Sequence, residues 1–321
     1  MRILALVPGG IGDQILFFPA LDTLKRVYPE AQIDVVVEPR AKEAYRVSKA
    51  VRDTILFDFG GNNSLADWGN LLGVIRDREY DVAFSVRPSW GVGLLLWLTG
   101  IPTRIGYAGV STGFLTHPVA QKTEQYTAAM YYDLLQGLGI HEACPEVSIS
   151  LPRKDIEWAE AEQKRLGLQG GGYVLIHGSS HQAATSAEQE KTYPIKSWVK
   201  IIQDFRQKQP DLPIVLLRGL EPPDLVDDLM EVSLKPAPLV TRPGELGKLA
   251  AMIAGSSLML CTESTAMNLA VALQAFTLTI FGPTDPAKLL PVSDRFLGLQ
   301  SSTGKAADIP PEKVLEKIWG G

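Results

Sequence analysis

The chain contains 321 residues, of which 45% are hydrophobic and 21% are charged, and its formal net charge is −5. This composition excludes collagen-like, disordered and coiled-coil proteins, and two isolated cysteines exclude a disulfide framework. Residues 1–150 and 151–321 each carry a small net negative charge. Because nucleic-acid-binding domains present a strongly basic face, we expect no nucleic-acid partner.

The first predicted elements form a β-loop-α-β unit. Residues 3–7 predict a short strand, residues 8–13 form the glycine-rich turn PGGIGD, and a predicted helix over 13–27 leads to a second strand over 33–37. Both strands are apolar on both faces, which is typical of a buried parallel sheet. The opening apolar run is too short for a signal-peptide core, and so we expect a cytoplasmic protein.

The same plan starts again in the second half of the chain. A strand over 173–176 precedes a long polar loop, a helix over 195–208 and a strand over 214–217. Two starts of one plan predict two doubly wound α/β domains, 1–150 and 151–321. Further strands are predicted over 82–86, 258–261 and 277–281, and further helices over 127–137, 264–273 and 312–318. The most apolar window, 91–101, is about half the ~20 residues that span a bilayer.

Asp13 lies where the first strand gives way to the first helix, at the edge where open α/β sheets bind ligands. Asp13 can serve as a helix cap, as a general base or as both, because the two roles are compatible. The preceding loop fails the dinucleotide fingerprint, because Ile15 stands at the third glycine position. Glu38 does lie where a ribose-binding acid is expected, so a nicotinamide-dependent oxidoreductase stays open as an alternative.

Two junctions in the second half are suited to a diphosphate. Glu263, Ser264 and Thr265 separate a predicted strand from a predicted helix, and helix N-termini with added hydroxyls bind phosphate groups. Ser179 and Ser180 follow the strand over 173–176, and Lys191 lies in the polar loop beyond them. The alternatives are a capping cluster for the first junction and a solvated surface lysine for Lys191.

A basic stretch follows the second strand. Arg46, Lys49 and Arg52 recur at near-helical spacing, so that one face would carry positive charge toward an anionic partner. A solvated helix face is the alternative explanation. No Asp-x-Asp pair or His/carboxylate cluster lies beside the phosphate-binding loops, and so we expect no metal cofactor.

Several segments resemble one known family. They are GDQILFFPALDTLKRVYPEAQIDVVVE (12–38), IHGSS (176–180), KTYP (191–194) with Trp198, ESTAMNLAVAL (263–273) and FGPTDP (281–286). Together they resemble glycosyltransferase family 9, the ADP-heptose:lipopolysaccharide heptosyltransferases, over the whole chain. The resemblance implies a GT-B fold, in which two Rossmann-like domains face each other across a cleft, the first holding the acceptor and the second the nucleotide sugar. It also implies inverting, metal-free transfer.

The resemblance assigns roles to individual residues. Asp13, in a Gly-Asp motif with Gly12 on the acceptor side, would deprotonate the acceptor hydroxyl. Lys191 would lie near the donor phosphates, and Glu221 would contact the nucleoside. The donor-binding acid and hydroxyl would be Glu263 and Ser264. Thr265, Asn268, Ser179 and Ser180 complete the expected donor-binding set. The basic stretch, rather than the resemblance, adds Arg46 and Lys49 to the expected acceptor-binding set.

The donor motif departs from the family pattern. Glu263 stands in place of Asp, Thr265 in place of Gly and Asn268 in place of His, while Gly178 follows His177 without the usual Pro. A Cβ at 265 would reshape the diphosphate pocket. The nucleotide-diphosphate sugar, with ADP-type favoured, serves as co-substrate and no other cofactor is expected. The sugar, the acceptor, the oligomeric state and the degree of activity stay open.

The expected function is transfer of a sugar to an anionic glycolipid or saccharide of the cell envelope. Such an acceptor would bring a cytoplasmic protein to the inner face of the cytoplasmic membrane, by peripheral association. A nicotinamide-dependent oxidoreductase and a non-catalytic nucleotide-sugar-binding protein of the same fold are the two alternatives.

Overall fold

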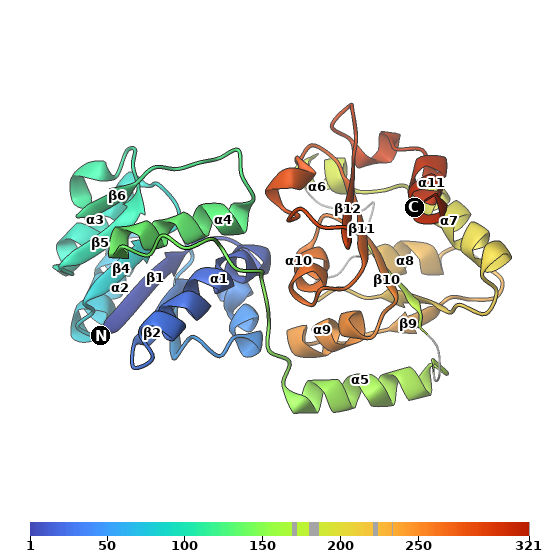
Figure 1. Cartoon of the computed structure of the whole chain (residues 1–321), viewed down its shortest axis with the longest axis horizontal. Coiled ribbons are helices and arrows are strands. Elements are labelled where there is room, and N and C mark those ends of the chain that lie inside the picture. The colour runs from blue at the N-terminus through green and yellow to red at the C-terminus, as the bar shows by residue number, and fades with distance from the viewer. Residues whose placement is uncertain (169–171, 180–185, 221–223, 233, 321) are drawn as a thin grey trace. The chain divides into compact units, whose positions relative to one another are not determined.

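The structure is a computed structural model that describes residues 1–168, 172–179, 186–220, 224–232 and 234–320. The chain divides into two compact units, Met1–Ser150 and Leu151–Gly321 (Figure 1). Each unit contains one six-stranded parallel sheet with its own helices and its own core. The division falls at the position where the sequence places the domain boundary.

The sheet of the first unit has the strand order β3-β2-β1-β4-β5-β6. Its strands are β1 (Arg2–Val7), β2 (Gln32–Val37), β3 (Asp53–Leu56), β4 (Val82–Ser85), β5 (Thr103–Tyr107) and β6 (His117–Val119). The central strand is buried on both faces from Ile3 to Val7, as a parallel sheet covered by helices requires. Leu6 of β1 is level with Val36 of β2 and Ser85 of β4, so these strands end at one edge.

Helices and short 3₁₀ turns connect these strands. They are α1 (Ile11–Val27), η1 (Pro39–Val47), α2 (Leu65–Asp77), α3 (Trp90–Thr99), η2 (Thr112–Phe114), α4 (Thr127–Tyr132) and η3 (Asp133–Leu138). Leu4 and Leu6 of β1 pack into one core cluster with residues of α2 and α3. The helix expected over 127–137 is α4 followed by the 3₁₀ turn η3, whose C-cap residue Gly139 adopts the left-handed conformation with a φ of 75°.

The second unit repeats the topology of the first. Its sheet order is β12-β11-β10-β7-β8-β9. The strands are β7 (Val174–His177), β8 (Ile214–Leu217), β9 (Leu239–Thr241), β10 (Leu258–Thr262), β11 (Thr277–Phe281) and β12 (Phe296–Gln300). Numbered within its own unit, each sheet has the order 3-2-1-4-5-6, which is that of the dinucleotide-binding fold. Two doubly wound α/β domains are therefore confirmed.

Helices and 3₁₀ turns precede, connect and follow the strands of the second unit. They are α5 (Arg153–Arg165), α6 (Ser186–Lys191), α7 (Ile195–Lys208), α8 (Leu225–Met230), α9 (Leu246–Ala254), α10 (Thr265–Ala272) and α11 (Pro311–Trp319), with 3₁₀ turns η4 (Pro286–Lys288) and η5 (Ala306–Asp308). The segment expected to be a long loop between β7 and α7 contains α6. Among the helices that the structure describes, none is long and apolar enough to cross a membrane.

Open α/β sheets bind ligands where the strand order reverses, outside the carboxyl ends of the two strands that flank the reversal. In the first unit those strands are β1 and β4, and in the second they are β7 and β10. The fold thus defines two places to search for function, one in each unit.

Candidate functional sites

Asp13 lies at the reversal point of the first unit. It is the third residue of α1, which begins four residues after β1 ends. Its Oδ2 accepts a hydrogen bond of 2.9 Å from the backbone N–H of Gly10, and its Oδ1 accepts one of 3.1 Å from the hydroxyl of Tyr131. Asp13 therefore caps the helix, as the capping interpretation requires. Its carboxylate is at the same time held in one orientation at the ligand-binding edge.

Gly9 allows the carboxylate of Asp13 to lie where it does. The φ of Gly9 is +121°, which L side chains rarely adopt, and a Cβ there would come within 2.3 Å of Oδ2 of Asp13. The N–H of Gly9 donates to Oε1 of Glu38 at 3.0 Å, and Oε2 of Glu38 accepts from Arg40 at 2.9 Å. The acid considered for a ribose thus holds the loop beside Asp13 instead.

Tyr131 and Arg87 belong to this site and were not found from the sequence. Tyr131 lies on α4, 118 residues from Asp13, and is only 7% exposed. Its pKa is raised, first by burial and then by the charge of Asp13, while the charge of Arg87 acts in the opposite direction. Arg87 follows β4, the neighbour of β1, and this position at the shared edge was the one available signal.

The prediction of a basic helix face after the second strand is wrong. The 3₁₀ turn η1 ends at Val47, before Lys49, so these residues share no helix. Arg46 pairs with Glu43 at 3.2 Å, while Nε of Arg52 donates to buried Asp34 at 2.9 Å. The acceptor-binding role of Arg46 and Lys49 stays a prediction, as does that of Gly12, which lies in the first turn of α1.

In the second unit the junction of β10 and α10 lies at the reversal point between β7 and β10. Ser264 caps α10, since its Oγ accepts from the N–H of Met267 at 3.4 Å, and Thr265 is the first helical residue. Ser179, after β7, donates its N–H to Oγ1 of Thr262 at 3.4 Å. The two strand ends therefore meet. Helix N-termini at such an edge bind phosphate groups.

Lys191 and Glu263 form an ion pair at this junction. Nζ of Lys191 lies 2.6 Å from Oε1 of Glu263, and their side chains are 32% and 13% exposed. Gly282, directly after β11, makes this approach of α6 feasible, because a Cβ there would lie 2.3 Å from the carbonyl oxygen of Glu190. The solvated-lysine alternative is therefore wrong for Lys191. Its ammonium is instead held at the edge by a carboxylate.

Two buried oxygens at this junction have no hydrogen-bond partner among the described residues. They are Oε2 of Glu263 and Oδ1 of Asn268, whose Nδ2 donates to the carbonyl of Ser264 at 3.3 Å. Buried acceptors without a partner cost about 1–3 kcal/mol each. A bound molecule that offers hydroxyl groups would relieve that cost. The junction thus combines a cation, a helix N-terminus and two acceptors.

His177, at the end of β7, is buried, and burial lowers its pKa. Its Nδ1 lies 3.0 Å from the carbonyl oxygen of Leu217, and this contact links β7 to β8. Ser180 and Glu221, both expected to bind the donor, lie outside the described residues. Their roles stay predictions.

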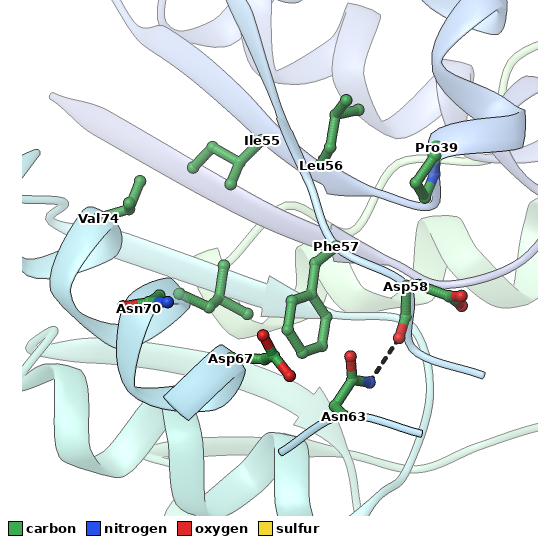
Figure 2. A pocket seen from close by; sticks show the side chains of 10 residues that line it. Pro39, Ile55, Leu56, Phe57, Asp58, Asn63, Asp67, Asn70 and Val74 are labelled. Carbon is green, nitrogen blue, oxygen red and sulfur yellow. Dashed lines mark hydrogen bonds between the residues drawn. The ribbon is translucent and has the colours of Figure 1, made fainter. Parts of the chain in front are cut away.

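A pocket lies at the edge of the first sheet, between β3 and α2. Its volume is about 300 Å³. Figure 2 shows Phe57, Asp58 and Asn63 among the side chains that line it. Nδ2 of Asn63 donates to the carbonyl of Asp58 at 2.6 Å, and Asp67 accepts from the N-cap residue Ser64. None of the residues predicted from the sequence lines this pocket. Across the described parts of the chain, no three metal-ligating side chains gather in one place.

The comparisons with known proteins agree with this architecture. The family model "Glycosyltransferase family 9 (heptosyltransferase)" matches residues 68–318. The chain belongs to glycosyltransferase family 9. It is therefore a glycosyltransferase, and the resemblance inferred from its motifs is confirmed.

The individual relatives of the chain share a quarter of its residues or fewer. Lipopolysaccharide heptosyltransferase 3 of Escherichia coli K12 is 22% identical, over 95% of this chain and 89% of that protein. An Arabidopsis thaliana protein, photosynthetic NDH subunit of subcomplex B 1, is 25% identical over 96% of this chain and 71% of its own. The structure of E. coli ADP-heptose LPS heptosyltransferase II superposes with a TM-score of 0.78 at 19% identity, covering 99% and 97%. The GT-B fold is thereby confirmed.

Proposed function

We propose that the protein transfers a sugar, heptose or a close relative, from an ADP-activated donor to a hydroxyl group of a lipid-linked, anionic saccharide of the cell envelope. The observation that carries this proposal is the Asp13 carboxylate, held by two hydrogen bonds at the reversal point of the first sheet. The names of the heptosyltransferase relatives supply the substrate class. A lipid-linked acceptor would place the reaction at the inner face of the cytoplasmic membrane.

Asp13 acts in this proposal as the general base. As the acceptor oxygen attacks the anomeric carbon, Asp13 takes the hydroxyl proton. The bond between the anomeric carbon and the diphosphate oxygen breaks in the same displacement, and the nucleoside diphosphate leaves with the electron pair. A single displacement inverts the anomeric configuration.

The second unit stabilises the leaving group. Negative charge grows on the diphosphate, and the N-terminus of α10 and the ammonium of Lys191 lie at one junction to receive it. Glu263 and Asn268 offer their unpartnered oxygens to hydroxyl groups of the donor. This charge supply does not require a metal ion, so that we expect turnover to continue in EDTA. Loss of turnover in EDTA with rescue by Mg²⁺ or Mn²⁺ would contradict metal independence.

A panel of donors tests the proposal. ADP-, UDP-, GDP- and dTDP-sugars and NAD(P) are added separately while the melting temperature is recorded. A ligand at 100 times its Kd stabilises the folded state by about 2.7 kcal/mol, so the ADP-sugar should produce the largest shift. Mass spectrometry of a lipid-linked acceptor then detects the transferred sugar.

Each result that contradicts the proposal supports a different alternative. Stabilisation by NAD(P) alone would support the oxidoreductase alternative, which the family match does not favour. A donor that binds without any product from a range of acceptors would support a non-catalytic role instead. The Arabidopsis relative is named as a subunit of a complex rather than as a transferase, which is why the non-catalytic alternative is included in the test.

A further inference from the structure

Helix α3 presents an apolar surface to solvent. Its sequence WGVGLLLWLT contains no charged residue. Val92, Leu95 and Leu96 face inward and join the core cluster with α2. Trp90, Leu94, Trp97 and Leu98 follow the spacing i, i+4, i+7 and i+8, which places them on one opposite stripe. We call these four residues the α3 outer face.

The α3 outer face is open to solvent, and the neighbouring loop extends it. Trp90 is 59% exposed, Trp97 54% and Leu98 44%, and Val110, in the loop after β5, is 68% exposed. The ring of Trp90 packs edge-on against Phe114 of η2 at 5.7 Å, which joins the face to that loop. Surface helices ordinarily carry polar residues on their outer side, so this stripe indicates a contact with an apolar partner.

The charge around α3 identifies the kind of partner. Although the whole chain is negative, no carboxylate occurs between Asp81 and Glu124, whereas Arg87, Arg104 and Lys122 all lie there. Lys122 pairs with Asp133 at 3.1 Å, so Arg87 and Arg104 carry the local surplus. Arg104 donates to the carbonyl groups of Ile101 and Phe114, which are uncharged and do not offset the guanidinium.

The adjoining helix does not reverse this sign. Helix α2 contributes Arg76 and Asp77, whose charges offset each other, and Asp67, whose single negative charge is smaller than the two positive charges of Arg87 and Arg104. Helices that lie in the interface of an anionic bilayer combine exposed tryptophan and leucine with a surplus of basic residues, as this region does.

We propose that the α3 outer face and Val110 dock the first unit onto an anionic lipid surface, with the tryptophan rings at the level of the headgroups. The proposal rests on the proposed function in one respect, the lipid-linked acceptor. Trp90 follows β4 at the same edge of the sheet as Asp13, so that docking there would present that edge to an acceptor anchored in the bilayer.

Co-sedimentation with vesicles tests the docking. The full chain is mixed with vesicles of phosphatidylcholine containing 30% phosphatidylglycerol, and with pure phosphatidylcholine vesicles. We expect binding to the anionic vesicles that weakens as salt is raised. The double variant Trp97→Ser/Leu98→Ser should bind at least tenfold more weakly at an unchanged melting temperature. Val292→Ser, a fully exposed apolar residue of the second unit, is the matched control and should bind like wild type.

Other outcomes overturn the proposal. They are absence of vesicle binding, equal binding by the double variant, or a self-association of the wild type that the double variant abolishes, which would assign the face to a second copy of the chain. A rate assay separates this inference from the proposed function. The double variant should keep the wild-type kcat on a water-soluble acceptor and lose rate only on acceptor in vesicles. A wild type inactive on both acceptors would contradict the proposed function, while the sedimentation result would still decide the docking.

Discussion

Asp13 combines a structural and a chemical role in one carboxylate. The hydrogen bond from Gly10 fixes Oδ2 to the helix terminus, and the hydroxyl of Tyr131 fixes the direction of Oδ1. A base held in one orientation loses little freedom when the acceptor hydroxyl arrives. Tyr131 is thus a positioning residue, since it acts on the acceptor through Asp13.

Removing the Tyr131 hydroxyl tests that role. Tyr131→Phe keeps the edge-on contact with Phe17 at 6.2 Å and deletes the donor to Asp13. We expect kcat to fall about tenfold, equivalent to 1.4 kcal/mol, with the donor Kd unchanged. In an Asp13→Asn background the same substitution should have no further effect on kcat, because the two residues act together.

Tyr107→Phe is the control for that variant. Tyr107 is also buried and donates to the carbonyl of Met130, the residue next to Tyr131, at 2.8 Å. Its loss should lower the melting temperature and leave kcat alone. Equal effects of the two substitutions on kcat would show that Tyr131 serves the packing of α4 only.

Lys191 gives a second prediction at this scale. Lys191→Ala should lower kcat at least tenfold, since the ammonium would meet charge that develops as the diphosphate leaves. The same variant should lose stability, because Glu263 is left partly buried without its partner. Adding Glu263→Gln should restore the melting temperature and not kcat. Recovery of both, or a wild-type kcat in Lys191→Ala, would show that the pair is structural.

At the scale of elements, a buried carboxylate ties β2 to β3 and to the end of α2. Asp34 accepts from Nε of Arg52 at 2.9 Å, from Arg78 at 3.0 Å and from the hydroxyl of Tyr80 at 2.6 Å. Burial of Asp34 opposes its ionisation, but these hydrogen bonds outweigh it, so that its pKa is lowered from 3.8. The cluster is part of the framework that carries the Asp13 loop.

Asp34→Ala should therefore reduce the free energy of unfolding by roughly 3 kcal/mol, at the lower end of the cost of breaking buried pairs because both arginines are partly solvated. A carboxylate whose pKa is lower in the folded state than in the unfolded state stabilises the protein at any pH above the unfolded-state pKa. This stabilisation is lost as the pH falls through the folded-state pKa. The difference from wild type should be constant above about pH 4 and shrink below it. Urea unfolding at several pH values measures this.

Asp53→Ala provides the comparison for the Asp34 variant. Asp53 pairs with the same Arg78 at 2.8 Å but is 52% exposed, so its loss should cost within about 1 kcal/mol. Equal costs for the two variants would show that the buried position of Asp34 adds nothing to the pairing.

Elements with strong local signals could be predicted from the sequence. α7, β8 and β11 have the predicted bounds, because each is a continuous apolar or amphipathic run that ends at a polar residue or a glycine. Five strands were missed. The edge strands β3, β6 and β9 have only three or four residues and little apolar periodicity, while β5 and β12 have five residues each and include polar residues or glycine. Helix α3 was missed because its apolar residues surround the helix and leave no polar face to reveal the period.

The candidate sites divide in the same way. Glu263 and Ser264 directly follow a strand that local patterning identifies, and Asp13 lies in the first turn of the helix after β1, so their place at a sheet edge could be deduced. Tyr131 reaches Asp13 only through the packing of α4 on α1, a contact between distant segments that no local pattern encodes. The basic face failed because Arg52 turns to the buried Asp34 instead of extending a helix.

At the scale of the whole molecule, one topology occurs twice with different chemistry at its reversal points. The first unit places a carboxylate there, with an arginine nearby, which suits the activation of a hydroxyl. The second places a lysine, a helix N-terminus and two unpartnered oxygens there, which suits a nucleotide sugar. Family membership joins the two halves into one glycosyltransferase.

The turnover of Asp13→Asn on an ADP-sugar, measured beside its donor Kd, tests this account most directly. Asparagine can still accept from Gly10, so the loop and donor binding should persist, while kcat falls by about 10²–10⁴. Asp67→Asn is the matched control, because Asp67 occupies the same third position of α2 and accepts from its N-cap Ser64 at 2.8 Å. We predict that Asp67→Asn keeps the wild-type kcat. A wild-type kcat in Asp13→Asn would contradict the account.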